Sequence, residues 1–100
     1  MMIDQSAQKW GANRHTMASV IQCESQWDVE AKGDYTIDGV HFYPKKLAPA
    51  GAWPTSFGLV QIHLPAHPDI TKQQAYDPVF AIDYLAHQLS IGKGSQWTCY

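Results

Sequence analysis

One glutamate of the chain stands where its carboxyl group could do acid–base chemistry. Glu24 shares a helical face with Val20 and Ile21, so we expect its carboxyl group on the inward side of a helix, in the last turn. Burial and the negative end of the helix dipole both raise the pKa of a carboxyl group. A carboxyl group that stays protonated near neutral pH can protonate the leaving oxygen of a glycosidic bond. The alternative is a glutamate at a helix end whose head reaches water.

Hydrophobic periodicity predicts helices at both ends of the chain. Apolar residues at helical spacing predict a short helix over residues 3–10, ended by Gly11, and a longer one from the N-cap Asn13 to about Trp27. Later helices are expected over Thr71–Tyr76 and from the cap Asp77-Pro78 to about Ile91.

Between these helices the pattern changes to that of strands. Strand formers lie on either side of Asp38-Gly39, so residues 34–43 predict a β-hairpin with a type I′ turn, the only sheet expected. Three prolines predict an irregular loop over residues 44–54. The expected fold is α+β and mostly helical, with four or five helices and one small β-hairpin.

The bulk composition indicates one domain without an excess of positive charge. The chain has 100 residues, 45% of them hydrophobic, so we expect a single domain over residues 1–100. A net charge of −2 gives no basic surface for nucleic acid. No apolar run approaches the roughly 18 residues of a membrane span, and no signal peptide is visible. The expected partner is neither a nucleic acid nor a membrane.

Two cysteines, Cys23 and Cys99, lie far apart in the sequence. As a hypothesis they form a disulfide, which would close a long loop and stabilise the domain by about 4–5 kcal/mol. The alternative is a pair of reduced, buried thiols.

Three segments carry a resemblance to known families. They are Glu24-Ser25 followed by Asp28-Val29-Glu30-Ala31, then Ser56-Phe57-Gly58-Leu59-Val60-Gln61-Ile62, and finally Asp77-Pro78 followed by Ala81-Ile82-Asp83-Tyr84-Leu85. In order and rough spacing the chain resembles the goose-type lysozyme and lytic-transglycosylase families. The resemblance implies a lysozyme-like fold, cleavage of the β-1,4 bond between N-acetylmuramic acid and N-acetylglucosamine in peptidoglycan, and Glu24 as general acid or acid/base.

The resemblance also implies roles for residues of the second and third segments. The family residue that matches Gln61 contacts substrate, and the alternative is a glutamine that caps a short helix. The match to Tyr84 would bring its hydroxyl group near the catalytic carboxyl group, and the alternative is a core tyrosine. Ser25 and Ser56 match motif positions and are expected to brace the backbone around the substrate site. Ala81 departs from the family, which usually has asparagine there, and this puts the substrate contacts of that helix in question.

Aromatic residues near the hairpin could stack on sugar faces, because their rings offer apolar area with little conformational entropy to lose. The candidates are Tyr35, Tyr43, Trp53 and Trp97. Tyr43 and Trp53 are favoured because they bracket the proline-rich loop that leads to the second segment. The alternative for each is a place in the core.

A second carboxylate would activate water or support an oxocarbenium-like transition state. Asp34 and Asp38 both lie in the expected hairpin, and since the turn already explains Asp38, Asp34 is the candidate. A mechanism with Glu24 alone stays open, in which the muramyl 6-hydroxyl group attacks and leaves a 1,6-anhydro product.

Other classes of function are less well supported by the residues. His63 and His67 are four apart, but Pro65 between them spoils a helical pair, so neither a metal nor a cofactor is expected. Nothing around Cys23 indicates the activated thiolate of a cysteine hydrolase. The serious alternative is a non-catalytic glycan-binding or structural module that keeps a lysozyme-like cleft. Because an inactive relative would most often have lost its glutamate, Glu24 favours an enzyme.

The implied substrate also sets an expectation for location. Peptidoglycan lies outside the cytoplasmic membrane, where a disulfide could persist. We therefore expect an extracytoplasmic monomer, secreted, periplasmic or released by a phage, that acts on glycan strands.

Overall fold

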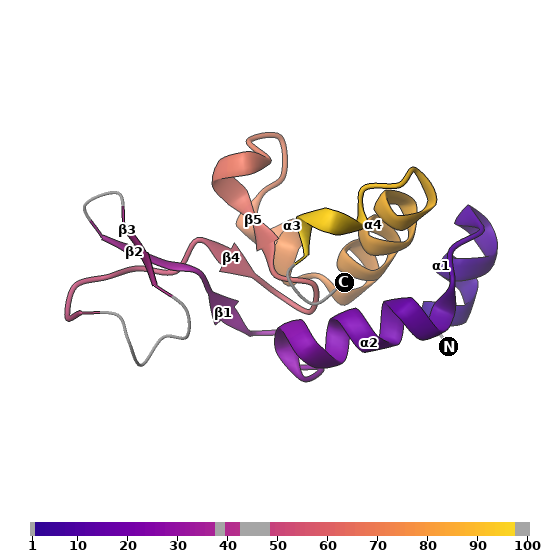
Figure 1. Cartoon of the computed structure of the whole chain (residues 1–100), viewed down its shortest axis with the longest axis horizontal. Helices are drawn as coiled ribbons and strands as arrows, with labels where there is room; N and C mark the ends of the chain where they lie inside the picture. Colours follow the sequence, from indigo (N-terminus) through magenta and orange to yellow (C-terminus); the bar gives the residue numbers. More distant parts are fainter. Residues whose placement is uncertain (1, 38–39, 43–48, 98–100) are drawn as a thin grey trace.

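Helices form one end of the molecule, and two small antiparallel sheets extend away from them (Figure 1). The computed structural model describes residues 2–37, 40–42 and 49–97. The molecule measures 42 × 25 × 22 Å along its principal axes. The architecture is the mostly helical α+β fold that the periodicity predicts. Among the described residues, none of the helices has the length and apolar character that crossing a membrane requires.

The described residues form four α-helices, and the two longest begin at the capping residues that the sequence predicts. They are α1 (Met2–Trp10), α2 (Arg14–Ser25), α3 (Lys72–Tyr76) and α4 (Pro78–Ser90), with two short 3-10 helices, η2 (Leu64–Ala66) and η3 (Gly94–Gln96). Asn13 and Asp77 each accept hydrogen bonds from the backbone N–H groups two and three residues on. Thr71 begins α3 with a capping box completed by Gln74. Side-chain capping by Asn13 and Asp77 thus fixes where the two longest helices begin.

The end of α2 differs from the prediction by two residues. Gln26 and Trp27 adopt left-handed backbone conformations, with φ of 52° and 65°, so the helix stops at Ser25. The N–H of Gln26 still reaches the carbonyl of Gln22 at 3.0 Å. The periodic pattern continued past this point because a left-handed cap at a non-glycine residue has no strong sequence signal.

The hairpin is confirmed, and a second sheet was missed. β2 (Tyr35–Ile37) pairs with β3 (Val40–Phe42), while the turn at 38–39 lies outside the described residues. A three-stranded sheet adds β1 (Lys32–Gly33), β4 (Ser56–Phe57) and β5 (Ile62–His63) in the order β1-β4-β5. The prediction of a single sheet was wrong because strands of two residues are too short to show an alternating pattern.

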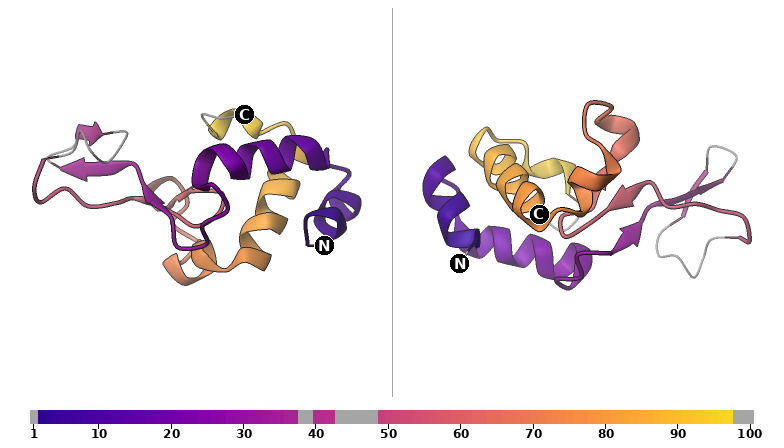
Figure 2. Two further views of the ribbon diagram at one scale, coloured as in Figure 1. Left: turned by 90° about the horizontal axis from the view of Figure 1, so that it is seen from below. Right: turned by 180° about the vertical axis from the view of Figure 1, so that it is seen from behind.

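The core joins the helices to the segment that contains β4 and β5. α1 and α2 both lie against α4 (Figure 2). Its buried side chains include Met17, Val20 and Ile21 of α2, Ala81, Ile82, Leu85 and Ala86 of α4, and Phe57, Leu59, Val60 and Ile62 of the segment between them in sequence. Trp97 closes the core from the C-terminal side, where its indole N–H donates to the carbonyl of Val60 at 2.6 Å. Residues 56–62 are therefore an inner element and not a surface loop.

Gly58 allows this segment to turn inside the core. Its φ is +84°, and a Cβ atom there would lie 1.9 Å from the backbone carbonyl oxygen of Ala75. A left-handed conformation favours glycine, and a backbone approach this close requires it. Gly11, which ends α1 with a φ of +72°, has the same kind of backbone but nothing within 4 Å of the corresponding position.

We predict that Gly58→Ala lowers the free energy of unfolding by about 2–5 kcal/mol, because it adds a steric clash to the left-handed strain. Gly11→Ala is the matched control and should lower it by about 1–2 kcal/mol, through the strain alone. Urea unfolding of both variants measures the difference. Equal losses at the two glycines would contradict the inner position of residues 56–62.

Candidate functional site

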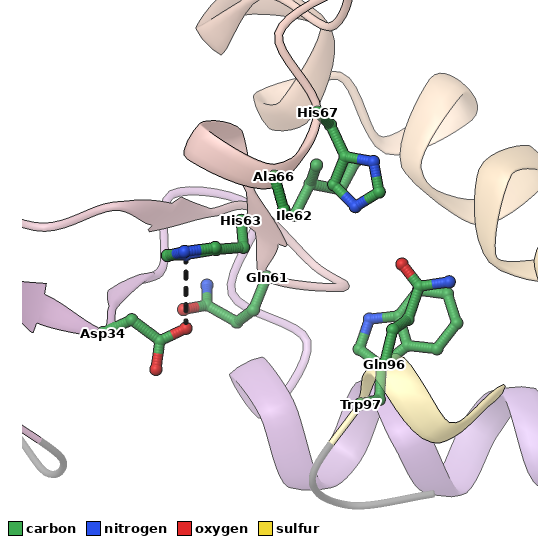
Figure 3. A pocket seen from close by; sticks show the side chains of 8 residues that line it. All are labelled: Asp34, Gln61, Ile62, His63, Ala66, His67, Gln96 and Trp97. Atoms are coloured by element: carbon green, nitrogen blue, oxygen red, sulfur yellow. Dashed lines mark ion pairs between the residues drawn. The ribbon is translucent and has the colours of Figure 1, made fainter. Parts of the chain in front are cut away.

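A cavity of about 360 Å³ lies where the three-stranded sheet meets the C-terminal segment (Figure 3). Its lining residues are Asp34, Gln61, Ile62, His63, Ala66, His67, Gln96 and Trp97. Asp34 follows β1. Gln61 immediately precedes β5, which contains Ile62 and His63, and Gln96 and Trp97 lie at the end of η3. The cavity therefore unites parts of the chain that are more than sixty positions apart in sequence.

Asp34 stands on one wall, in a conformation that its neighbours fix. Its φ is 51°, a left-handed value that non-glycine residues seldom adopt. The hydroxyl of Thr55 donates to the Asp34 backbone carbonyl at 2.6 Å, and the hydroxyl of Ser56 donates to its carboxylate. His63 lies on the same wall, with Nδ1 4.0 Å from the carboxylate. The carboxylate is thus held in place while its side chain stays 45% exposed.

The strand register of the three-stranded sheet brings Asp34, Ser56 and His63 together. Gly33 pairs with Ser56, and Ser56 pairs with His63, so the three strands bring one residue each to the same level. Asp34 follows Gly33 directly. Ser56 has no exposed surface, so in a substrate site it would act through Asp34.

Gln61 lines the cavity beside Asp34. Its φ is 50°, and its side-chain amide donates to the carbonyl of Gly58 at 2.9 Å. A Cβ atom at Gly33 would come within 2.4 Å of its side-chain oxygen, so glycine at that position makes room for the amide. Gln61 is predicted to contact substrate, and the structure brings it together with Asp34 in one cavity.

Tyr84 stands behind the opposite wall. Its hydroxyl donates to the side-chain oxygen of Gln96 at 3.0 Å and lies 3.2 Å from Nε2 of His67. Burial, with a smaller contribution from the charge of Asp69, raises the pKa of Tyr84 to about 12. Tyr84 was expected to approach the catalytic carboxyl group, whereas its hydrogen bonds connect two residues of the cavity wall.

Glu24 lies in the last turn of α2 and is half-buried, while Val20 and Ile21 on the same face are fully buried. Glu24 is not among the described residues that line the cavity. The adjacent Ser25 is buried, and its hydroxyl donates to the carbonyl of Ile21, which braces the helix end. α2 leads through residues 26–31 into β1, and the carbonyl of Ala31 accepts the N–H of Gly58 at 2.9 Å.

The other predicted site residues lie elsewhere. Trp53 is 53% exposed and pairs through its backbone with Thr36, so it extends the two-stranded sheet. Tyr43, and Cys99 of the predicted disulfide, lie outside the described residues, so that disulfide stays a prediction. Cys23 lies on the exposed side of α2.

Two histidines of the cavity wall were considered in the sequence only as metal ligands. His63 directly follows the segment 56–62, and that position could have identified it as a site residue. No group of three or more histidine, cysteine or acidic side chains that could hold a metal ion occurs among the described residues. Trp97, one of the four aromatic candidates, lines the cavity. For Gln96 the sequence carries no such signal, since only the fold returns the C-terminal segment to the sheet.

The raised pKa of Tyr84 makes a prediction for stability at alkaline pH. In the unfolded chain the phenol loses its proton near pH 10, and in the folded protein near 12, so its contribution to the free energy of unfolding is complete below pH 10 and falls between about 10 and 12. Unfolding of the wild type and of Tyr84→Phe across this range measures the difference. A difference that does not change with pH would contradict the burial of this hydroxyl group.

Comparison of the chain with known proteins gives no relative. No family model matches it, and neither a curated protein nor a solved structure does. Its function is therefore inferred from the residues of the site.

Proposed function

We propose that this protein cleaves the β-1,4 glycosidic bond between N-acetylmuramic acid and N-acetylglucosamine in peptidoglycan, with Glu24 as general acid/base. The observation that carries the proposal is the cavity in which Asp34 and Gln61, singled out from different parts of the sequence, lie together. A helix with Glu24 in its last turn, followed by a small sheet, is also what the resemblance to the lysozyme families implies.

The position of Glu24 suits an acid. It lies at the C-terminal end of α2, where the negative end of the helix dipole favours the neutral form of a carboxyl group. The side chain is only partly buried, so the group stays accessible to a substrate. A glycan strand is longer than one cavity, and in the proposed reaction its scissile bond would lie between the cavity at Asp34 and the carboxyl group of Glu24.

The lining of the cavity suits a neutral, hydroxyl-rich ligand. Of the described residues that line it, Gln61 and Gln96 contribute amide groups, Trp97 a ring and Asp34 a carboxylate, and none of them is a lysine or an arginine. Sugars are recognised by this combination of polar groups and aromatic surface. We propose the glycan strand as the partner of the protein. The protein would then act where peptidoglycan lies, outside the cytoplasmic membrane.

In the proposed reaction Glu24 donates its proton to the glycosidic oxygen as the bond to the anomeric carbon breaks. Asp34 accepts a proton from the water that attacks this carbon, and hydrolysis leaves a reducing end. If the muramyl 6-hydroxyl group attacks instead, Glu24 takes up that proton in turn and the product is a 1,6-anhydro sugar. The non-catalytic glycan-binding module remains the alternative.

We predict that Glu24→Gln stays folded and clears a peptidoglycan suspension about a hundredfold more slowly, because it loses general-acid assistance. Glu30→Gln is the matched control, since Glu30 is the other glutamate and is exposed. It should clear the suspension at the wild-type rate. If wild type and Glu24→Gln clear equally, Glu24 is not the acid of the reaction. If the wild type binds peptidoglycan without clearing it, the cleavage proposal fails and the binding module is favoured.

A second prediction concerns Asp34. Asp34→Asn should slow the release of reducing ends by about a hundredfold, because the amide cannot take a proton from water. Mass spectrometry of the digest separates reducing ends from anhydro ends, which lack one water. An undiminished rate of reducing-end release by Asp34→Asn would remove this residue from the reaction.

A further inference from the structure

The strand pairing on either side of Asp34 keeps one continuous register. Two backbone pairs flank it, Gly33 with Ser56 and Thr36 with Trp53. Each strand has two residues between these pairs, so Asp34 stands opposite Thr55. In a regular antiparallel ladder the two would exchange both backbone hydrogen bonds, and the side chain of Asp34 would lie on the face of the sheet opposite to that of Ser56.

Asp34 departs from this regular geometry. Its φ is 51°, and the N–H of Thr55 donates to the carbonyl of Gly33 at 3.1 Å instead of to that of Asp34. The Asp34 carbonyl accepts the hydroxyl group of Thr55 at 2.6 Å. The Asp34 carboxylate accepts the hydroxyl group of Ser56 through Oδ2. The left-handed conformation thus turns the carboxylate to the face of the sheet that carries Ser56.

The hydroxyl group of Ser56 is fixed in place. Ser56 lies in β4, the central strand of the three-stranded sheet, and has no exposed surface. A hydroxyl group has one hydrogen to donate, and that of Ser56 points to the carboxylate of Asp34. Nδ1 of His63 lies 4.0 Å from the same oxygen, Oδ2. One oxygen of the carboxylate is therefore bound on the inner side of the wall.

The second oxygen of the carboxylate, Oδ1, is the one that can meet a substrate. Among the described residues, none donates a hydrogen bond to Oδ1. Figure 3 shows this oxygen turned away from His63. The side chain of Asp34 is 45% exposed and lines the cavity, so water in the cavity can reach Oδ1.

We propose that Ser56 and Thr55 are positioning residues that hold Oδ1 of Asp34 where it takes a proton from the attacking water. Thr55 holds the backbone of Asp34, and Ser56 holds its carboxylate. The two hydroxyl groups thereby set the ratio of reducing ends to 1,6-anhydro ends among the products. This role of Ser56 and Thr55 rests on the proposed cleavage of peptidoglycan.

The two products require different groups. In hydrolysis the water oxygen bonds to the anomeric carbon, a water proton passes to Oδ1 of Asp34, and the glycosidic oxygen leaves with the proton of Glu24; exchange with solvent restores both carboxyl groups. In the anhydro reaction Glu24 gives its proton to the same leaving oxygen. The muramyl 6-hydroxyl oxygen then bonds to the anomeric carbon, and its proton passes to Glu24. A displaced Asp34 therefore slows hydrolysis and leaves the anhydro reaction unchanged.

The test measures the ratio of reducing to anhydro ends by mass spectrometry of a peptidoglycan digest. We expect Ser56→Ala and Thr55→Val each to lower this ratio about tenfold, because a small displacement of a catalytic group has a large effect on rate. A general loss of folded protein slows both reactions equally and does not move the ratio. If Ser56→Ala does not fold, Thr55→Val decides, since valine keeps the shape of threonine.

Ser6→Ala is the matched control. The hydroxyl group of Ser6 also donates to a carboxylate, that of Asp83 at 3.4 Å, and neither residue is among those described in the lining of the cavity. This variant should keep the wild-type ratio.

The outcomes separate this role from the proposed cleavage. A wild type that clears peptidoglycan but releases anhydro ends alone would overturn the role of Ser56 and Thr55, while cleavage by Glu24 stands. The same holds if Ser56→Ala and Thr55→Val keep the wild-type ratio, or if Ser6→Ala lowers it as much as they do. A wild type that leaves peptidoglycan uncleaved would overturn the proposed function itself, and the positioning role with it.

Discussion

The burial of residues 56–62 is the constraint on which the rest of the structure depends. The segment packs between α2 and α4, and its turn is possible because Gly58 approaches the carbonyl of Ala75 without a side chain. The segment also includes Ser56 and Gln61 and is followed by His63. Its polar side chains therefore lie at one wall of the cavity. Core packing on one side and the site on the other are thus properties of one short stretch of chain.

Much of the fold could be predicted because its signals are local. The caps at Asn13 and Asp77 and the paired strands of the hairpin each depend on residues close together in sequence. The three-stranded sheet could not be predicted, since strands of two residues carry no periodicity and their partners come from distant segments. The left-handed end of α2 escaped for a related reason, because Gln26 and Trp27 are residues that ordinarily continue a helix.

The site was predictable to the extent that single residues carry a motif. Asp34 and Gln61 were identified from the sequence and lie together in the cavity. The surroundings of Asp34 were not foreseen, because Thr55, Ser56 and His63 reach it through strand register, which follows from the fold and not from spacing along the chain. The hydrogen bonds of Tyr84 to the cavity wall were missed in the same way.

Two residues of the cavity wall adopt strained backbone conformations, so the geometry of the site lowers the stability of the fold locally. Asp34 and Gln61 both have positive φ, a conformation that costs a residue with a Cβ atom about 1–2 kcal/mol and costs glycine almost nothing. Glycine at either position would relax the backbone and delete the polar group that the conformation aims into the cavity. Relief of the backbone strain at these two positions would therefore come at the expense of the polar groups that line the cavity.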